Sequence, residues 1–280
     1  MTGPADSVGD RRLTPWNGRV AHVSLRGRVA AERFVEGEPA AVAVPLADLC
    51  ATAGGARDRQ LLMGAAFGVL ERRGGWAFGM AGDDGLVGWI AEAALGPPVR
   101  PSHRVAAPAT HLYPAPDLKT REVARLSLGA RLEVTGVDGA FARCAAGWVP
   151  AVHLRPVDAP EADPVTVAES LVGTPYLWGG NSRDGIDCSG LVQAALRACG
   201  RPCPADSDLQ RAALGRPLRA DEAPRRGDLA FWSGHVGWMA DATTLLHANA
   251  HHMAVAAEPL AGAAARIAAA GVTGFALHRL

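Results

Sequence analysis

The chain has 280 residues, enough for two or three small domains with a sizeable core. Its apolar fraction of 49% and charged fraction of 20% are typical of a soluble globular protein. The 28 basic and 28 acidic side chains cancel, which argues against a nucleic-acid binder with its basic excess. Residues 1–20 lack the apolar run of a secretory signal, and no run of about 18 apolar residues is present. We therefore expect a cytoplasmic protein that does not enter a membrane.

Residues 1–35 are interpreted as an N-terminal segment, and an internal repeat follows it. At a constant offset of 65 residues, four positions of one copy match four of the other: Gly64, Val69, Gly74 and Trp76 match Gly129, Val134, Gly139 and Phe141. Each copy then reaches a Gly-Trp pair, ending at Trp89 and Trp148, and the second copy is six residues shorter before it. The shorter copy predicts a tighter hairpin.

Both copies consist of short strand-like runs separated by glycine turns, which predicts two small β-barrels. The pattern of Gly-aromatic followed by Gly-Trp resembles bacterial SH3 domains. A Gly-Pro-Pro sequence at 96–98 separates the copies, and a Pro- and acid-rich linker at 155–164 follows them. We therefore predict a first SH3-like domain at 36–98 and a second at 99–157.

In residues 158–280, segments of helical period are followed by strand-like runs, which predicts an α+β domain. Helices are expected at 165–172 and 187–199, because apolar residues in the second recur at helical period and Gly200 is placed to end it. Strands are expected at 228–232, 235–240, 244–250 and 272–277.

Cys188 is the candidate nucleophile because it falls at the start of the predicted helix at 187–199. Asp187 is a plausible N-cap for this helix. The N–H groups and dipole at a helix start stabilise a thiolate and can hold an oxyanion. A lone cysteine at a helix start is weak evidence, so a base and an orienting group are required.

Two histidines supply the base and the orienting group. The strands that carry His235 and His247 can pair as a hairpin around Asp241, with the two histidines opposite each other and on one face. His235 then acts as the base, and His247 fixes its tautomer through a hydrogen bond.

Four motifs carry a resemblance to a known family. They read GTPYLWGG at 173–180, GIDCSGLVQ at 185–193, RGDLAFW with HVG at 226–237, and LHA at 246–248. In this order they resemble the NlpC/P60 cysteine peptidases, whose fold is papain-like. The resemblance implies Cys188, His235 and His247 as the catalytic set, with no cofactor and no metal.

Two SH3 domains ahead of such a peptidase resemble the γ-D-glutamyl-L-diamino acid endopeptidases of the dipeptidyl-peptidase VI type. This resemblance implies murein peptide recycling, with a short murein peptide that starts with a free L-Ala as substrate. The substrate-binding residues that it implies are Tyr176, Asp187, Ser189, Asp206, Ser207 and, from the first SH3 domain, Asp58. Leu86 stands where this type has a tyrosine, so one contact to the free amine is missing.

Other functions stay open at this point. The chain is alternatively an exported hydrolase of intact peptidoglycan that uses its SH3 domains as wall anchors, or an inactive peptide-binding protein. A metal site near His251 and His252 is disfavoured, because no ligand spacing is recognisable. The sequence does not give the oligomeric state or the preferred diamino acid.

Overall fold

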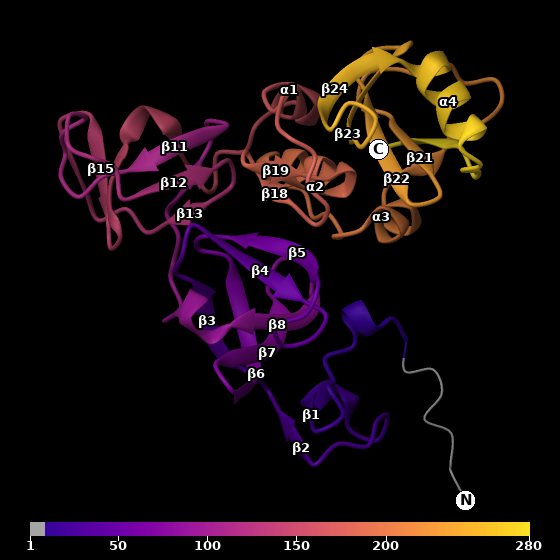
Figure 1. The fold of residues 1–280 in the computed structure, drawn as a ribbon. Coiled ribbons are helices and arrows are strands. Elements are labelled where there is room, and N and C mark those ends of the chain that lie inside the picture. The colour runs from indigo at the N-terminus through magenta and orange to yellow at the C-terminus, as the bar shows by residue number, and fades with distance from the viewer. Residues whose placement is uncertain (1–8) are drawn as a thin grey trace, which may run out of the picture.

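The computed structural model describes residues 9–280 and shows an N-terminal segment, two β units and a C-terminal α+β domain (Figure 1). The N-terminal segment holds two 3-10 turns and two short parallel strands: η1 (Arg11–Leu13), β1 (Val20–His22), η2 (Val23–Leu25) and β2 (Arg33–Val35). No helix in the described residues is long and apolar enough to cross a membrane.

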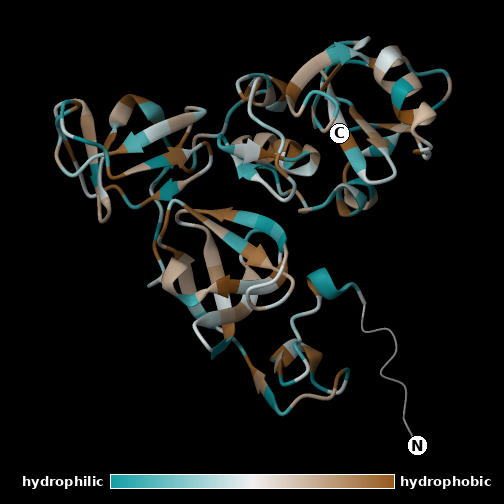
Figure 2. Ribbon diagram, viewed as in Figure 1, coloured by the Kyte–Doolittle hydropathy of each residue, from teal (hydrophilic) through white to brown (hydrophobic). Residues whose placement is uncertain are grey.

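The first β unit is one seven-stranded antiparallel sheet in the order β5-β4-β8-β7-β6-β3-β9. Its elements are β3 (Glu38–Val42), β4 (Leu46–Cys50), β5 (Arg57–Leu62), β6 (Ala66–Arg73), β7 (Trp76–Ala81), β8 (Val87–Ala91), η3 (Glu92–Ala94) and β9 (Leu95–Gly96). Phe67, Leu86 and Ile90 are at most 1% exposed and pack in its core. Hydrophobic residues of this unit lie along the strands, as the brown segments show (Figure 2).

The second β unit divides its strands among three small sheets. Its elements are β10 (His103–Val105), β11 (Ala109–Leu112), β12 (Ala124–Ser127), β13 (Arg131–Leu132), β14 (Gly136–Asp138), β15 (Phe141–Cys144), β16 (Gly147–Pro150), η4 (Ala151–His153) and β17 (Leu154–Pro156). Among the described strands, the pairings of neither unit close into a barrel. The two predicted barrels are thus two small β units, and closure is not found.

The internal repeat corresponds to matching structure in the two units. Gly74 and Gly139 both have positive φ angles, 59° and 54°, in tight turns. The aromatic residues two positions later, Trp76 and Phe141, each begin a strand, β7 and β15. The turn after β15 is the tighter one, as the six missing residues predict.

The C-terminal domain is α+β, with a six-stranded antiparallel sheet in the order β20-β25-β21-β22-β23-β24. The strands are β18 (Asn181–Ser182), β19 (Gly185–Ile186), β20 (Arg216–Pro217), β21 (Leu229–Trp232), β22 (His235–Met239), β23 (Thr244–Asn249), β24 (Ala254–Pro259) and β25 (Ala276–Arg279), and the helices are α1 (Pro164–Glu169), α2 (Cys188–Ala198), α3 (Ser207–Ala213) and α4 (Leu260–Ala269). The division at 98/99 and 157/158 stays our proposed domain boundary.

The predicted elements of this domain agree with the structure except at its end. The predicted strand 272–277 is wrong in position, because residues 272–275 are a connection and β25 starts at Ala276. Six further elements were not predicted: β18, β19, α3, β20, β24 and α4. The core forms where α2 packs on β22, and it buries Leu191, Leu196 and Trp238 completely.

The two β units meet at Gly64, where the chain has a φ of 78°. The N–H of Arg131 donates to the carbonyl oxygen of Met63 across this junction, at 2.8 Å. A Cβ atom on Gly64 would clash with the backbone of Arg131. At the matching position of the repeat, Gly129 has a φ of 88°, yet its Cβ would meet only Leu62 Cδ1, at 3.4 Å.

We therefore expect Gly64→Ala to destabilise the protein more than Gly129→Ala. Both substitutions carry the left-handed backbone cost of about 1–2 kcal/mol, and only the first adds a backbone clash of about 1–3 kcal/mol. The measurement is the urea midpoint of unfolding for the two variants and the unsubstituted chain. An equal loss of stability in both variants would contradict the assigned contact.

Candidate active site

Asp187 positions Cys188 at the first residue of α2. Its Oδ1 accepts hydrogen bonds from the backbone N–H of Gly190, at 2.6 Å, and from Ser189 Oγ, at 3.0 Å. Its Oδ2 accepts from the N–H of Gly179, at 3.0 Å. One carboxylate therefore caps the helix and ties it to the loop that precedes it. The predicted N-cap is confirmed.

His235 and His247 contact each other through their rings. His235 Nε2 lies 2.7 Å from His247 Nδ1, and the ring centroids are 5.0 Å apart. The shared face is as predicted, whereas the predicted register is wrong. Trp238 pairs with Leu246, so the two histidines are diagonal neighbours.

The turn between β22 and β23 explains the difference in register. Asp241 Oδ1 accepts from the N–H groups of Thr243 and Thr244, each at 2.8 Å, and the N–H of Ala240 donates to the carbonyl oxygen of Thr244. This Asx turn moves the centre of the hairpin from Asp241 to Ala242. The partner of His247 is then Gly237, two residues away from the predicted partner His235. Because side chains alternate between faces, a change of two residues leaves both rings on one face.

Gly237 makes the diagonal contact of the histidines possible. A Cβ atom on Gly237 would lie 2.8 Å from His247 Cβ. Only glycine therefore leaves room for His247 to lean toward His235 across the hairpin.

Glu258 and Arg266 extend the histidine pair, and the sequence did not predict them. His247 Nε2 lies 2.8 Å from Glu258 Oε1. Arg266 binds the same carboxylate through two nitrogens, at 2.6 and 2.7 Å. Glu258 lies on β24 and Arg266 on α4. No motif marks them, because their role depends on elements that the sequence pattern did not reveal.

The Glu258 carboxylate determines which ring nitrogen carries the proton in His247 and in His235. Hydrogen bonding from Arg266, followed by His247, lowers the pKa of Glu258 to about 2, so it accepts near neutral pH. His247 then carries its proton on Nε2, which leaves Nδ1 to accept from His235 Nε2–H. With its proton on Nε2, His235 has Nδ1 as its basic nitrogen.

Burial favours the neutral forms of both Cys188 and His235. Burial, followed by the charge of Asp187, raises the pKa of the Cys188 thiol to about 12, while the backbone N–H groups of Val236 and Ser189 act in the opposite direction. Burial, followed by His247, lowers the pKa of His235 to about 3. Burial therefore opposes the thiolate that the helix start was expected to favour, and it also favours the neutral imidazole of His235.

The predicted substrate-binding residues fall into two groups. Tyr176 is half-buried and packs against the core cluster that contains Cys188, and burial, followed by the charges of Cys188 and Asp187, raises its pKa to about 12. Asp187 and Ser189 flank Cys188 directly. Ser207 is half-buried at the start of α3.

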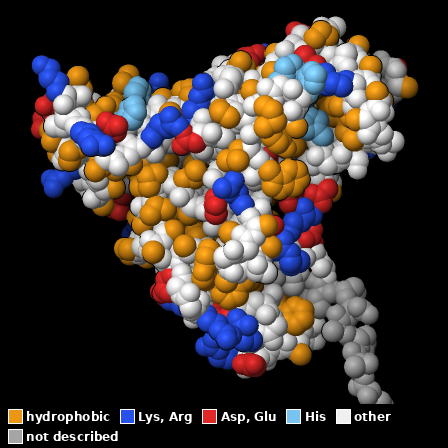
Figure 3. All heavy atoms as spheres, viewed as in Figure 1, with side chains coloured by type: hydrophobic (Ala, Val, Ile, Leu, Met, Phe, Trp, Pro, Cys, Tyr) orange, Lys and Arg blue, Asp and Glu red, His pale blue; other side chains and the backbone are white. Residues whose placement is uncertain are grey.

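Asp58 and Asp206 already have arginine partners. Asp58 pairs with Arg11 at 2.7 Å, and Asp206 pairs with Arg12 at 2.5 Å and with Arg59 at 3.2 Å. Acidic and basic side chains gather at the junction of the first β unit and the C-terminal domain (Figure 3). The sequence did not predict these arginines as part of the site.

One group of described residues has a composition that suits a metal ion: His247, His252 and Glu258, with ligand atoms within 4.8 Å of one another. Glu258 is already neutralised by Arg266, and both ring nitrogens of His247 lie within hydrogen-bond distance of His235 and Glu258. The donor set therefore fits an acid–base relay better than a cation site.

Two parts of the chain match known protein families. Residues 173–269 match the NlpC/P60 family, and residues 49–95 match the bacterial dipeptidyl-peptidase SH3 domain. A probable endopeptidase of Corynebacterium glutamicum is 31% identical over 127 residues, which is 41% of this chain and 60% of that protein. A dipeptidyl-peptidase 6 of Lysinibacillus sphaericus is 39% identical over 87 residues, and a γ-D-glutamyl-L-lysine dipeptidyl-peptidase of Bacillus subtilis is 34% identical over 94 residues. Each of these two matches covers 30% of this chain and 31% of the relative.

A solved structure of an NlpC/P60 family protein from Bacillus cereus has the same fold, with a TM-score of 0.68 and 20% identity over 80% of this chain and 94% of that chain. An NlpC/P60 endopeptidase from Photobacterium damselae has a TM-score of 0.59 and 11% identity over 92% of this chain and 76% of that chain. The chain therefore contains an NlpC/P60 domain of the cysteine peptidase class at residues 173–269 and a bacterial SH3 domain at residues 49–95.

Proposed function

We propose that this chain is a cysteine peptidase that hydrolyses the γ-D-glutamyl–diamino acid bond of short murein peptides, in cell-wall peptide recycling in the cytoplasm. The observation that carries the proposal is the hydrogen bond of 2.7 Å between His235 and His247, on the two strands that pack against the helix of Cys188. The name of the Bacillus subtilis relative supports a γ-D-glutamyl bond to a diamino acid, and the names of both relatives support a peptide substrate. The second β unit is proposed as a further SH3-like domain, on the basis of the repeat.

The geometry supports an acyl transfer in three steps: attack, loss of the amine and hydrolysis. Cys188 Sγ attacks the γ-carbonyl carbon of D-Glu while His235 Nδ1 takes the thiol proton. The N–H groups at the start of α2 and the Tyr176 hydroxyl stabilise the oxyanion. The His235 imidazolium then protonates the leaving amine of the diamino acid. Water, with His235 as base, hydrolyses the thioester and regenerates the thiol.

A free N-terminal L-Ala in the substrate stays a prediction from the resemblance. It depends on acidic groups that would bind the terminal ammonium: Asp58, Asp187 and Asp206. Asp58 and Asp206 are ion-paired with Arg11 and Arg12. Asp187 Oδ1 lies 3.9 Å from Nη1 of a third arginine, Arg59.

The proposed function is tested with L-Ala-γ-D-Glu-L-Lys and the corresponding diaminopimelate peptide. We expect release of L-Ala-D-Glu by the unsubstituted chain, and a fall in rate of at least about 1000-fold in Cys188→Ala, because no other group can form the thioester. Cys199→Ala, a cysteine at the far end of the same helix, is the matched control and should keep full activity. Equal rates with Cys188→Ala would sink the mechanism, and soluble fragments from purified sacculi would favour an exported wall hydrolase instead.

Glu258→Gln should lower kcat by about 10- to 100-fold with little change in KM, because the neutral amide no longer stabilises the imidazolium relay through His247. Glu169→Gln serves as a control, since Glu169 pairs with Arg226 outside the site. The two variants are compared by steady-state kinetics on the same peptide. An unchanged kcat in Glu258→Gln would show that the carboxylate only supports the fold.

The resting protonation state is tested by alkylation. An ordinary thiol reaches half of its maximal rate with iodoacetamide near pH ~8.5, so the rate at Cys188 should still be rising above pH 9 if burial keeps the thiol protonated. The background from the other cysteines is taken from Cys188→Ala. A plateau reached below pH 7 would indicate a thiolate–imidazolium pair and contradict the neutral resting state.

A further inference from the structure

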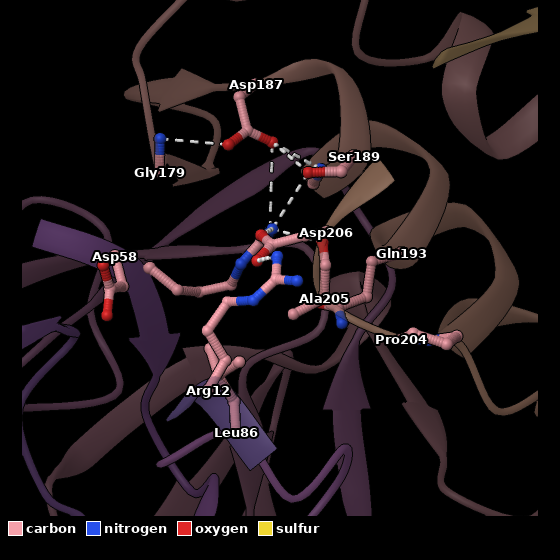
Figure 4. A network of polar contacts seen from close by, with 12 residues as sticks. Arg12, Asp58, Leu86, Gly179, Asp187, Ser189, Gln193, Pro204, Ala205 and Asp206 are labelled. Atoms are coloured by element: carbon pink, nitrogen blue, oxygen red, sulfur yellow. Dashed lines mark hydrogen bonds and ion pairs between the residues drawn. The ribbon is translucent and has the colours of Figure 1, made fainter. Parts of the chain in front are cut away.

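Arg59 of β5 reaches from the first β unit into the C-terminal domain and ends beside the nucleophile. Its side chain is 1% exposed. Its Nη2 donates to Ser189 Oγ at 2.9 Å, to the carbonyl oxygen of Ala205 and to Asp206 Oδ1 at 3.2 Å, and its Nη1 lies 3.9 Å from Asp187 Oδ1. In Figure 4, Asp187 and Ser189 approach this network from one side and Asp206 and Arg12 from the other.

The acceptors around Arg59 form a cation subsite next to the reacting sulfur. Asp187 and Ser189 are the residues directly before and after Cys188, so a group bound there lies close to the acyl part of a peptide. A buried cation is tolerated only when carboxylates and other acceptors surround it. Here the cation is supplied by the chain itself.

Two arginines of the chain already engage the carboxylates of this subsite. Nε and Nη1 of Arg59 are buried without a hydrogen-bond partner among the described residues. Arg12 binds the other oxygen of Asp206 at 2.5 Å and also Asp208 at 2.6 Å. An incoming ammonium would therefore meet two guanidinium groups of the same charge.

The first β unit also closes the subsite sterically. The backbone of β5 packs so tightly against the loop before α2 that a Cβ atom on Gly179 would lie 2.9 Å from the carbonyl oxygen of Asp58. Arg59 itself is almost fully buried between the two domains.

We propose that Arg59 is a specificity-determining residue that occupies the cation subsite beside Cys188, so that the enzyme prefers peptides whose amino end is neutral, such as N-acylated ones, over peptides with a free terminal ammonium. The inference rests on the proposed function for the bond that is cleaved. It replaces the free-amine preference that the sequence resemblance predicts.

The test compares L-Ala-γ-D-Glu-L-Lys with its N-acetyl form. For the unsubstituted chain we expect kcat/KM for the acetylated peptide to be about 10-fold higher, mainly through KM. In Arg59→Gln we expect the opposite preference: kcat/KM for the free peptide should exceed that for the acetylated peptide by at least about 10-fold, because the free ammonium then supplies the missing cation. Arg59→Lys should keep the original order, and Arg72→Gln, a substitution on the neighbouring strand β6, should leave the ratio unchanged.

Binding separates this inference from the proposed function. Calorimetry with Cys188→Ala measures the affinity for both peptides without turnover, and tighter binding of the acetylated peptide supports the inference even if hydrolysis is absent and the proposed function fails. A preference of 10-fold or more for the free amine in the unsubstituted chain overturns the inference, as does failure of both peptides to bind. If Arg59→Gln does not fold, the ratio in the unsubstituted chain decides alone.

Discussion

The three hydrogen bonds accepted by Asp187 are the constraint on which the active-site geometry depends. They hold the helix start, the residue after the nucleophile and the loop at Gly179 in one arrangement. Burial is the main cause that raises the pKa of Cys188, and the same carboxylate adds to it, since a nearby negative charge opposes a thiolate. Asp187 thus fixes the helix start that carries Cys188 and at the same time opposes ionisation of its thiol.

A thiol whose ionisation is opposed by burial must lose its proton during the reaction. The relay from His235 through His247 to Glu258 suits this task, because a carboxylate at the far end stabilises positive charge only when the imidazole gains a proton. Arg266 prevents Glu258 from taking the proton itself, since its two hydrogen bonds keep the carboxylate strongly acidic. The order of groups along β22, β23, β24 and α4 therefore follows the direction in which charge develops.

The sequence predicted those parts of the site that lie within one local pattern. Cys188 and its cap were predictable because helix period and N-cap chemistry are encoded within a few residues. His235 and His247 were placed on the correct face, but their register depended on an Asx turn at Asp241 that the strand pattern does not encode.

Glu258 and Arg59 could not be predicted by the same reasoning. Glu258 depends on the pairing of a strand that lacks clear alternation. Arg59 meets Ser189 across 130 positions of sequence and across a domain junction. Contacts of this kind are set by packing between domains, and no local periodicity records them.

Because Arg59 belongs to the first β unit, catalysis and substrate selectivity depend on different domains. The reacting groups all belong to the C-terminal domain. The Arg59 guanidinium, which we propose sets the preference for a neutral amino end of the peptide, comes from the first β unit. A single change in β5 can therefore alter the choice of substrate without moving the nucleophile or the histidines. Chemistry and selectivity are thus free to evolve at different rates, and a C-terminal domain separated from the first β unit would carry a binding surface of different charge.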